Sequence, residues 1–179
     1  MKKFLFSMLL LVFVFEISYS QDYHFLKNEV MQRNVPITKV LLLTDSLIEK
    51  SADIFVYNFE QKLKQEFANR GIENMHFKSG VTLYDSSAIW QSFKPKTILR
   101  LVTDKTFYVT KYSGFTQSTK LLLQFRLELT DSKNPDEYIL LSVYKFGVAF
   151  DSFEKQGIVD KIVSDIIKFY VKQKYIPKK

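Results

Sequence analysis

Few residues of this 179-residue sequence are of the types that usually carry chemistry. There is no cysteine, which excludes a catalytic thiol, a thiolate zinc site, a disulfide scaffold and a lipid-modified amino-terminal cysteine. The two histidines, His24 and His76, lie far apart and lack the i, i+4 spacing of a helical zinc site. We therefore expect neither a metal nor a cofactor, and we expect each histidine to be a surface or hydrogen-bonded residue.

Carboxylates offer the remaining route to catalysis. Asp45, Asp85 and Asp104 fall in segments predicted to be loops, and two of them could meet in space as an acid–base pair. Ordinary turn chemistry explains the same three positions. The sequence has neither a glycine-rich phosphate loop nor a Gly-x-Ser-x-Gly elbow. A non-catalytic protein is therefore predicted, and a hydrolase built from gathered Asp and Ser residues is the alternative.

Aromatic residues are more numerous and make up 16% of the chain. Those on the predicted late strands and in one loop could form an interaction surface: Tyr108, Tyr112, Phe115, Tyr138, Tyr144 and Phe146. If helices cover only one face of the sheet, part of this set faces outward and contacts a partner, a ligand or a second copy. The alternative places the rings in a single core and leaves polar residues on the outward face, namely Gln124, Arg126, Glu128 and Lys145.

The first twenty residues resemble an export signal. Lys2 and Lys3 precede an apolar run over residues 4–15, which is shorter than the roughly 20 residues that a membrane-spanning helix needs. Small residues at positions 18 and 20 predict cleavage between Ser20 and Gln21. The mature protein is then expected to be periplasmic or secreted and to carry no transmembrane span. An uncleaved amino-terminal anchor is the alternative.

Hydrophobic periodicity predicts the elements of the mature chain. After an amino-terminal arm over residues 21–37, the expected strands cover residues 39–44, 72–77, 97–103 and 107–112, and a hairpin covers 120–150. The expected helices cover residues 51–70, where Gly71 ends the helix, and 156–174. These elements predict one α/β (α+β) domain over residues 38–175. It is expected to be a two-layer sandwich, with two long helices on one face of a mixed, mainly antiparallel sheet.

The chain is basic, with a formal net charge of +7 at pH 7. Its carboxyl end, which includes a basic tail over residues 176–179, gathers Lys172, Lys174, Lys178 and Lys179. These lysines could make weak contact with an anionic surface. Lysines near the negative end of a helix dipole are also the ordinary pattern at such a position. Export argues against nucleic acid as a partner.

The order of the elements resembles that of a group of cell-envelope accessory proteins with an anticodon-binding-like α/β fold. The likeness rests on the predicted strands 39–44 and 72–77, the helices 51–70 and 156–174, and the hairpin 120–150. The group includes the amino-terminal domain of the Tol system's propeller protein, the soluble part of the curli secretion channel subunit, and auxiliary lipoproteins of lipid-transport ABC systems. This chain lacks the cysteine of the lipoprotein members.

The resemblance implies a non-catalytic accessory protein of the bacterial cell envelope that acts through protein–protein contacts. Its partner would be another envelope protein or a second copy of the chain. The alternative is a small-ligand or glycan-binding module that uses an aromatic face of the sheet.

Overall fold

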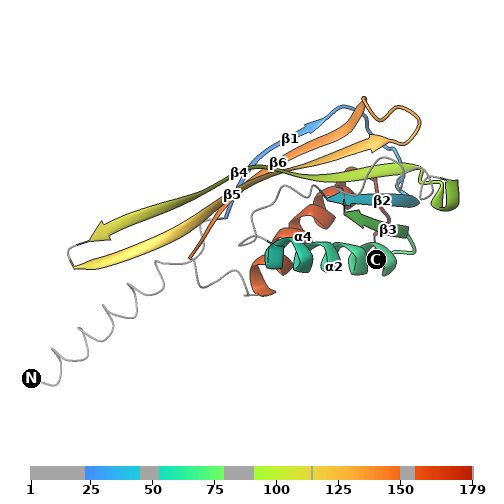
Figure 1. The fold of residues 1–179 in the computed structure, drawn as a ribbon. Helices are drawn as coiled ribbons and strands as arrows, with labels where there is room; N and C mark the ends of the chain where they lie inside the picture. Colours follow the sequence, from blue (N-terminus) through green and yellow to red (C-terminus); the bar gives the residue numbers. More distant parts are fainter. Residues whose placement is uncertain (1–22, 45–52, 79–90, 114, 150–155, 179) are drawn as a thin grey trace, which may run out of the picture.

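The computed structural model describes residues 23–44, 53–78, 91–113, 115–149 and 156–178. In these residues a six-stranded sheet has two helices packed on one face (Figure 1). The strands are β1 (Tyr23–Val30), β2 (Lys39–Thr44), β3 (Glu73–Lys78), β4 (Thr97–Ser113), β5 (Thr116–Asp131) and β6 (Tyr138–Ala149). The helices are α2 (Asp53–Ala68) and α4 (Gln156–Lys172). This is the predicted two-layer α/β sandwich.

The strand order is β1-β6-β5-β4-β2-β3, and the sheet is mixed. Strand β2 pairs in parallel with β3 and with β4, whereas β4–β5, β5–β6 and β1–β6 are antiparallel. Helix α2 connects the parallel strands β2 and β3. A parallel pair needs a crossover connection of this length, because the chain must return to the same end of the sheet. The antiparallel end is built from two hairpins and the added edge strand β1.

Alternating apolar residues on β5 form the centre of the core. Leu123, Phe125, Leu127 and Leu129 are each at most 1% exposed and face the helices. Helix α2 contributes a stripe at three- and four-residue steps: Phe55, Phe59, Leu63 and Phe67. Helix α4 contributes a second stripe: Ile158, Val159, Ile162, Val163, Ile166, Ile167 and Tyr170. The apolar residues at every second position of β5 and at every third or fourth position of the two helices therefore pack into one hydrophobic core.

Strand β4 is continuous where the sequence predicted two strands with a loop at Asp104. The register passes from the pair Thr103–Phe125 to the pair Lys105–Gln124, so Asp104 is the extra residue of a β-bulge. Its carboxylate accepts a hydrogen bond from Arg126 Nε at 2.6 Å. The loop prediction at Asp104 is wrong because an unpaired residue can be absorbed inside a strand without ending it.

Both helices end in the same capping motif. At the end of α2, Gly71 has a φ of 71°, and the main-chain N–H of Ile72 donates to the Phe67 carbonyl at 3.0 Å. At the end of α4, Lys174 has a φ of 60°, and the N–H of Tyr175 donates to the Tyr170 carbonyl at 2.9 Å. These are Schellman bonds, which require a left-handed residue just after the helix. Glycine adopts that conformation without strain, but lysine does not.

The two ends of the described chain meet beside the core. Residues 23–30, part of the predicted amino-terminal arm, form the edge strand β1 on β6. The N–H of Ile37 donates to the carbonyl of Tyr175 at 2.7 Å. Tyr175 and Ile176 are buried, at 1% and 4% exposure. Ile176, assigned to the basic tail by the sequence, therefore lies in the core.

The β4–β5 hairpin extends past its neighbours. The pairing of β5 with β6 stops at Lys120–Ala149, whereas the pairing of β4 with β5 continues to Ser113–Thr116. Figure 1 shows this hairpin projecting as a two-stranded arm well beyond the helices. We call residues 110–119 the hairpin tip.

Candidate interaction site

The hairpin tip carries two exposed aromatic side chains. Phe115 is 111% exposed relative to its reference state, and Tyr112 is 76% exposed. Below them, the hydroxyls of Thr110 and Thr119 lie 3.2 Å apart across the two strands. The strand pairing holds the tip in place, and no other described element covers it. An arm that presents aromatic rings to water is the pattern expected of a contact surface, because buried aromatics contribute strongly to interfaces.

The other predicted surface residues are divided among different places. Tyr138 begins β6 and is 37% exposed. Tyr108 and Phe146 lie on β4 and β6, at positions whose side chains fall outside the described part of the structure. The pattern of alternating residues could not separate the tip from the rest, since it does not reveal how far each strand extends beyond its partner.

Tyr144 does not belong to any surface. It is 0% exposed, and its ring stacks on Phe125 with centroids 5.0 Å apart and an interplanar angle of 16°. The two residues are opposite one another in the register of β5 and β6. The prediction of a surface role for Tyr144 is wrong because cross-strand partners share a face, and Phe125 faces the helices.

The opposite face of β4 and β5 carries a chain of ion pairs. Arg126 lies between Asp104, whose Oδ1 is 2.6 Å from Nε, and Glu128, whose Oε1 is 3.2 Å from Nη1. Glu128 also faces Arg100, with Oε2 3.8 Å from Nη1. Gln124 adds a longer bond to Asp104 at 3.4 Å. From Arg100 to Arg126 the outward face of these two strands therefore carries ion pairs, as the alternative interpretation of the sequence proposed. Ile98, on the same face of β4, is apolar and 2% exposed.

A second polar cluster joins α2 to the carboxyl ends of β2 and β3. The Thr44 hydroxyl donates to Glu60 Oε1, and both residues are buried. His76 Nε2 lies 3.1 Å from Thr44 Oγ1 and 3.2 Å from Glu60 Oε1. The sequence did not bring these residues together, because they are separated by 16 and 32 positions. Only the hydrogen-bonded character of His76 was expected.

This cluster differs from a hydrolytic triad in one respect. A triad histidine uses one ring nitrogen for the nucleophile and the other for the carboxylate. Here the single nitrogen Nε2 faces both the hydroxyl of Thr44 and the carboxylate of Glu60. The arrangement is suited to fixing the helix on the sheet rather than to activating the hydroxyl.

The remaining sequence candidates are placed as follows. Among the described residues, no three His, Cys, Asp or Glu side chains gather as they would around a metal ion. In the same part of the chain, no helix is long and apolar enough to cross a bilayer. Asp45, Asp85, the predicted cleavage position and Lys179 lie outside the described residues. Lys172, Lys174 and Lys178 are exposed.

Comparison with known proteins gives structural likeness only. No family model matches the sequence, and no curated protein matches it. The fold is similar to that of one chain of a PelC dodecamer from Paraburkholderia phytofirmans (TM-score 0.48, 11% identity, covering 85% of this chain and 97% of that one). It is also similar to lipoprotein GNA1162 from Neisseria meningitidis (TM-score 0.46, 12% identity, covering 75% of this chain and 99% of that one). Values at this level establish no common function.

Proposed function

We propose that this chain is an exported, non-catalytic protein of the bacterial cell envelope that acts by protein–protein contact through the tip of its β4–β5 hairpin. One observation carries the proposal: Phe115 and Tyr112 are 111% and 76% exposed on an arm that no other described element covers. The partner is another envelope protein or a second copy of the chain.

The physical argument rests on the cost of leaving these rings in water. Each ring that becomes buried in an interface gains about 25 cal/mol for every Å² of apolar surface removed from solvent. Aromatic side chains also lose little conformational freedom on binding, and they are frequent among the residues that dominate interface energies. Pairing of β4 with β5 continues to Ser113–Thr116 and fixes the main chain next to both rings, which lowers the entropy cost of binding further.

The proposed location rests on the amino-terminal sequence. Cleavage between Ser20 and Gln21 would leave β1, which begins at Tyr23, almost at the new amino terminus. Expression with the native signal should therefore give an exported protein that begins at Gln21. Amino-terminal sequencing that finds Met1 on the exported protein would contradict this assignment.

The alternative function, binding of a small ligand or a glycan on an aromatic sheet face, has less support. It requires aromatic rings on the outward face of the late strands. Tyr144 is instead buried, and Arg126, Glu128 and Asp104 form ion pairs on that face. A hydrolase would need a nucleophile and base arranged as a pair, and the Thr44–His76 contact shares its nitrogen with Glu60.

Site-specific photocrosslinking tests the proposal. A photoreactive phenylalanine analogue is placed at Phe115, and the matched control is placed at Lys133, an exposed residue of the β5–β6 turn at the other end of the sheet. Irradiation of cells followed by mass spectrometry should give a defined adduct from position 115, either with this chain or with another envelope protein. Crosslinking from 133 should be weak and diffuse. Equal patterns from the two positions would refute the tip as the contact surface.

A further inference from the structure

Cations without a carboxylate partner gather at the end of the molecule opposite the hairpin tip. They lie in the β1–β2 connection, just before β4, and at the end of α4: Arg33, Lys94, Lys96, Lys172, Lys174 and Lys178. All six are exposed, and none forms an ion pair with a carboxylate of the described residues. We call these six residues the basic end.

Main-chain hydrogen bonds bring the three segments of the basic end together. The N–H of Ile37 donates to the carbonyl of Tyr175, which places the end of α4 beside the start of β2. The N–H of Lys96 donates to the carbonyl of Lys39 at 3.1 Å, which places the start of β4 beside the same strand. Figure 1 shows that the β1–β2 connection and the start of β4 lie at the end of the sheet away from the hairpin tip. Cations from distant parts of the sequence therefore share one end.

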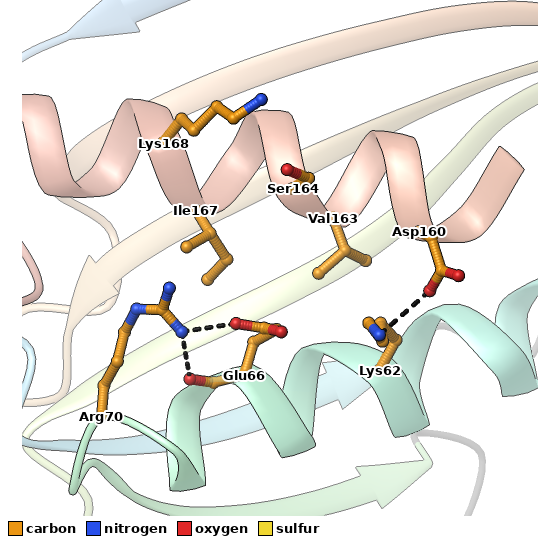
Figure 2. A pocket seen from close by; sticks show the side chains of 8 residues that line it. All are labelled: Lys62, Glu66, Arg70, Asp160, Val163, Ser164, Ile167 and Lys168. Carbon is orange, nitrogen blue, oxygen red and sulfur yellow. Dashed lines mark hydrogen bonds and ion pairs between the residues drawn. The ribbon is translucent and has the colours of Figure 1, made fainter. Parts of the chain in front are cut away.

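Cations elsewhere in the described chain are mostly neutralised by a neighbouring carboxylate. The groove between α2 and α4 is an example, since Lys62 Nζ lies 3.1 Å from Asp160 Oδ1 and Arg70 pairs with Glu66 (Figure 2). Cations matched in this way attract no further anion, whereas those of the basic end keep their full charge toward solvent.

The carboxylates near the basic end are too few to neutralise it. Glu73 pairs with Lys39 at 2.7 Å and is occupied by it. The others lie on and beside the β5–β6 turn, together with Lys133: Asp131, Asp136 and Glu137. This end of the molecule therefore has an excess of positive charge, which attracts an anionic partner.

Two lysines of the basic end hold a backbone conformation that lysine disfavours. Among the described residues other than glycine, a positive φ occurs at Asn34 (59°), Lys94 (47°) and Lys174 (60°). All three lie in the segments that form the basic end. Glycine would adopt this conformation without strain, whereas lysine does not. Strain of this kind is typical of positions where the side chain serves a function, which here is the charge.

The composition of the basic end fits an anionic lipid surface. Its cations are lysines apart from Arg33, and a lysine acts as a point charge rather than as a two-donor clamp for one phosphate. Such charges act together on an extended anionic surface. Met31, two residues before Arg33, is 54% exposed. A lipid interface accepts an apolar side chain beside cations, whereas a soluble polyanion offers only its charge.

We propose that the basic end docks on the surface of an anionic lipid bilayer, where its lysines contact headgroup phosphates. Strand β4 runs from Thr97, next to Lys96, to Ser113 in the hairpin tip, and has 17 residues. At about 3.3 Å per residue, it extends over about 55 Å. A molecule docked by its basic end therefore holds the hairpin tip at up to this distance from the membrane. The docking surface does not depend on the hairpin tip.

Co-sedimentation of the mature protein with vesicles tests the proposal. The vesicles contain phosphatidylcholine alone or with one third phosphatidylglycerol. We expect at least tenfold tighter binding to the anionic vesicles. Binding should weaken between about 0.1 M and about 1 M salt, because the Debye length falls from about 10 Å to about 3 Å. Equal binding to the two kinds of vesicle would overturn the proposal.

Alginate, a soluble polyanion without an apolar phase, identifies the source of the negative charge. It should bind the protein at least tenfold more weakly than anionic vesicles at equal charge concentration. Met31→Gln should weaken vesicle binding about threefold and leave alginate binding unchanged, because only the bilayer takes up the apolar side chain. Alginate binding as tight as vesicle binding would replace the lipid surface by a soluble polyanion and so overturn the proposal.

Two variants of equal net charge locate the docking surface. The first neutralises part of the basic end: Lys94→Gln, Lys96→Gln, Lys174→Gln and Lys178→Gln. The control removes the same charge elsewhere: Lys27→Gln, Lys64→Gln, Lys161→Gln and Lys168→Gln. Each lysine close to an anionic surface strengthens binding about fivefold, so the first variant should bind vesicles at least tenfold more weakly, and the control should change little. Equal losses in the two variants would overturn the proposal.

Glycine substitutions separate the charge from the fold. The double variant Lys94→Gly and Lys174→Gly should unfold at a higher temperature than the wild type, because strain is relieved, yet bind vesicles more weakly. Phe115→Ser, in the hairpin tip, should bind vesicles as the wild type does, so failure of the tip as a contact surface is distinguishable from failure of lipid docking. Unchanged vesicle binding in the glycine variant would show that the two lysines do not contact lipid, which contradicts the proposal.

Discussion

The rings of Tyr170 and Tyr175 meet edge to face, with centroids 5.9 Å apart and an interplanar angle of 84°, yet their hydroxyls have opposite surroundings. The Tyr175 hydroxyl donates to the carbonyl oxygen of Gln32 at 2.5 Å. The Tyr170 hydroxyl is buried with no hydrogen-bond partner among the described residues. Burial raises the pKa of both hydroxyls, and for Tyr170 the neighbouring Tyr175 raises it further.

Removing the two hydroxyls should therefore have different effects on stability. Tyr175→Phe loses a hydrogen bond and should lower the free energy of unfolding by about 0.5–1.5 kcal/mol. Tyr170→Phe removes a buried hydroxyl without a partner and should leave the free energy unchanged or raise it, because the desolvation cost disappears. Urea unfolding of the mature protein measures both. A larger loss in Tyr170→Phe than in Tyr175→Phe would show that the Tyr170 hydroxyl is bonded after all.

Alkaline pH should destabilise the fold through Tyr170. An unfolded tyrosine titrates near a pKa of about 10, whereas the folded state holds the Tyr170 proton to higher pH. The contribution of Tyr170 to the free energy of unfolding is therefore complete below about pH 10. It decreases as pH rises above this value, because the unfolded state then binds fewer protons than the folded state. The urea midpoint of the wild type should be lower at pH 10.5 than at pH 8, and this decrease should be smaller in Tyr170→Phe. Identical decreases in the two proteins would contradict the pKa direction.

The two helix caps should respond with opposite signs. A Cβ at Gly71 would meet nothing within 4 Å, so Gly71→Ala adds only the left-handed strain of about 1–2 kcal/mol and should destabilise. Lys174→Gly relieves the same strain at the end of α4 and should stabilise by about 0.5–1 kcal/mol. Lys168→Gly, at an exposed position inside α4, is the control and should cost about 1 kcal/mol. Thermal unfolding ranks the three; a loss in Lys174→Gly would rule out strain at this cap.

Glu128 should matter more for stability than an outward-facing residue normally does. It is 5% exposed and pairs with Arg126 and Arg100. Glu128→Ala should cost about 1.5–3 kcal/mol because a buried carboxylate is lost from the ion pairs: Arg100 is left without this partner, and Arg126 keeps only Asp104. Phe125→Ala in the core should cost about 3–5 kcal/mol. Lys133→Ala, on an exposed turn, should change stability by less than about 0.5 kcal/mol. A Glu128→Ala variant as stable as the Lys133→Ala variant would show that the ion pairs of Glu128 do not stabilise the fold.

The parts of the fold that follow from local pattern could be predicted. Leu123 to Leu129 alternate with polar residues, and burial of one face follows directly from that period. The stripes of α2 and α4 and the turn at Gly71 are equally local signals. Strand β1 gave no such signal, because it is an edge strand whose existence depends on β6, more than a hundred residues away.

The candidate site depended on long-range placement and was predicted only in part. Phe115 was identified from its loop, but Tyr144 was grouped with it although register places Tyr144 against Phe125. Thr44, Glu60 and His76 are individually unremarkable, and only the crossover of α2 brings them together. The buried Nε of Arg70, which has no hydrogen-bond partner among the described residues, is a property of tertiary packing that no sequence spacing encodes.

The pairing of β1 with β6 sets an order for folding. Asn28 and Ser142 bond through their side chains across 114 positions, whereas β4, β5 and β6 pair with sequence neighbours. Contacts of long sequence separation form slowly, because a large loop must close before any contact is gained. The two hairpins can therefore assemble early, while β1, the first of these strands to be synthesised, adds to the sheet last. Until β1 adds to the sheet, the edge of β6 can pair with another chain. The concentration of incompletely folded copies therefore determines how much of the protein aggregates before the sheet is complete.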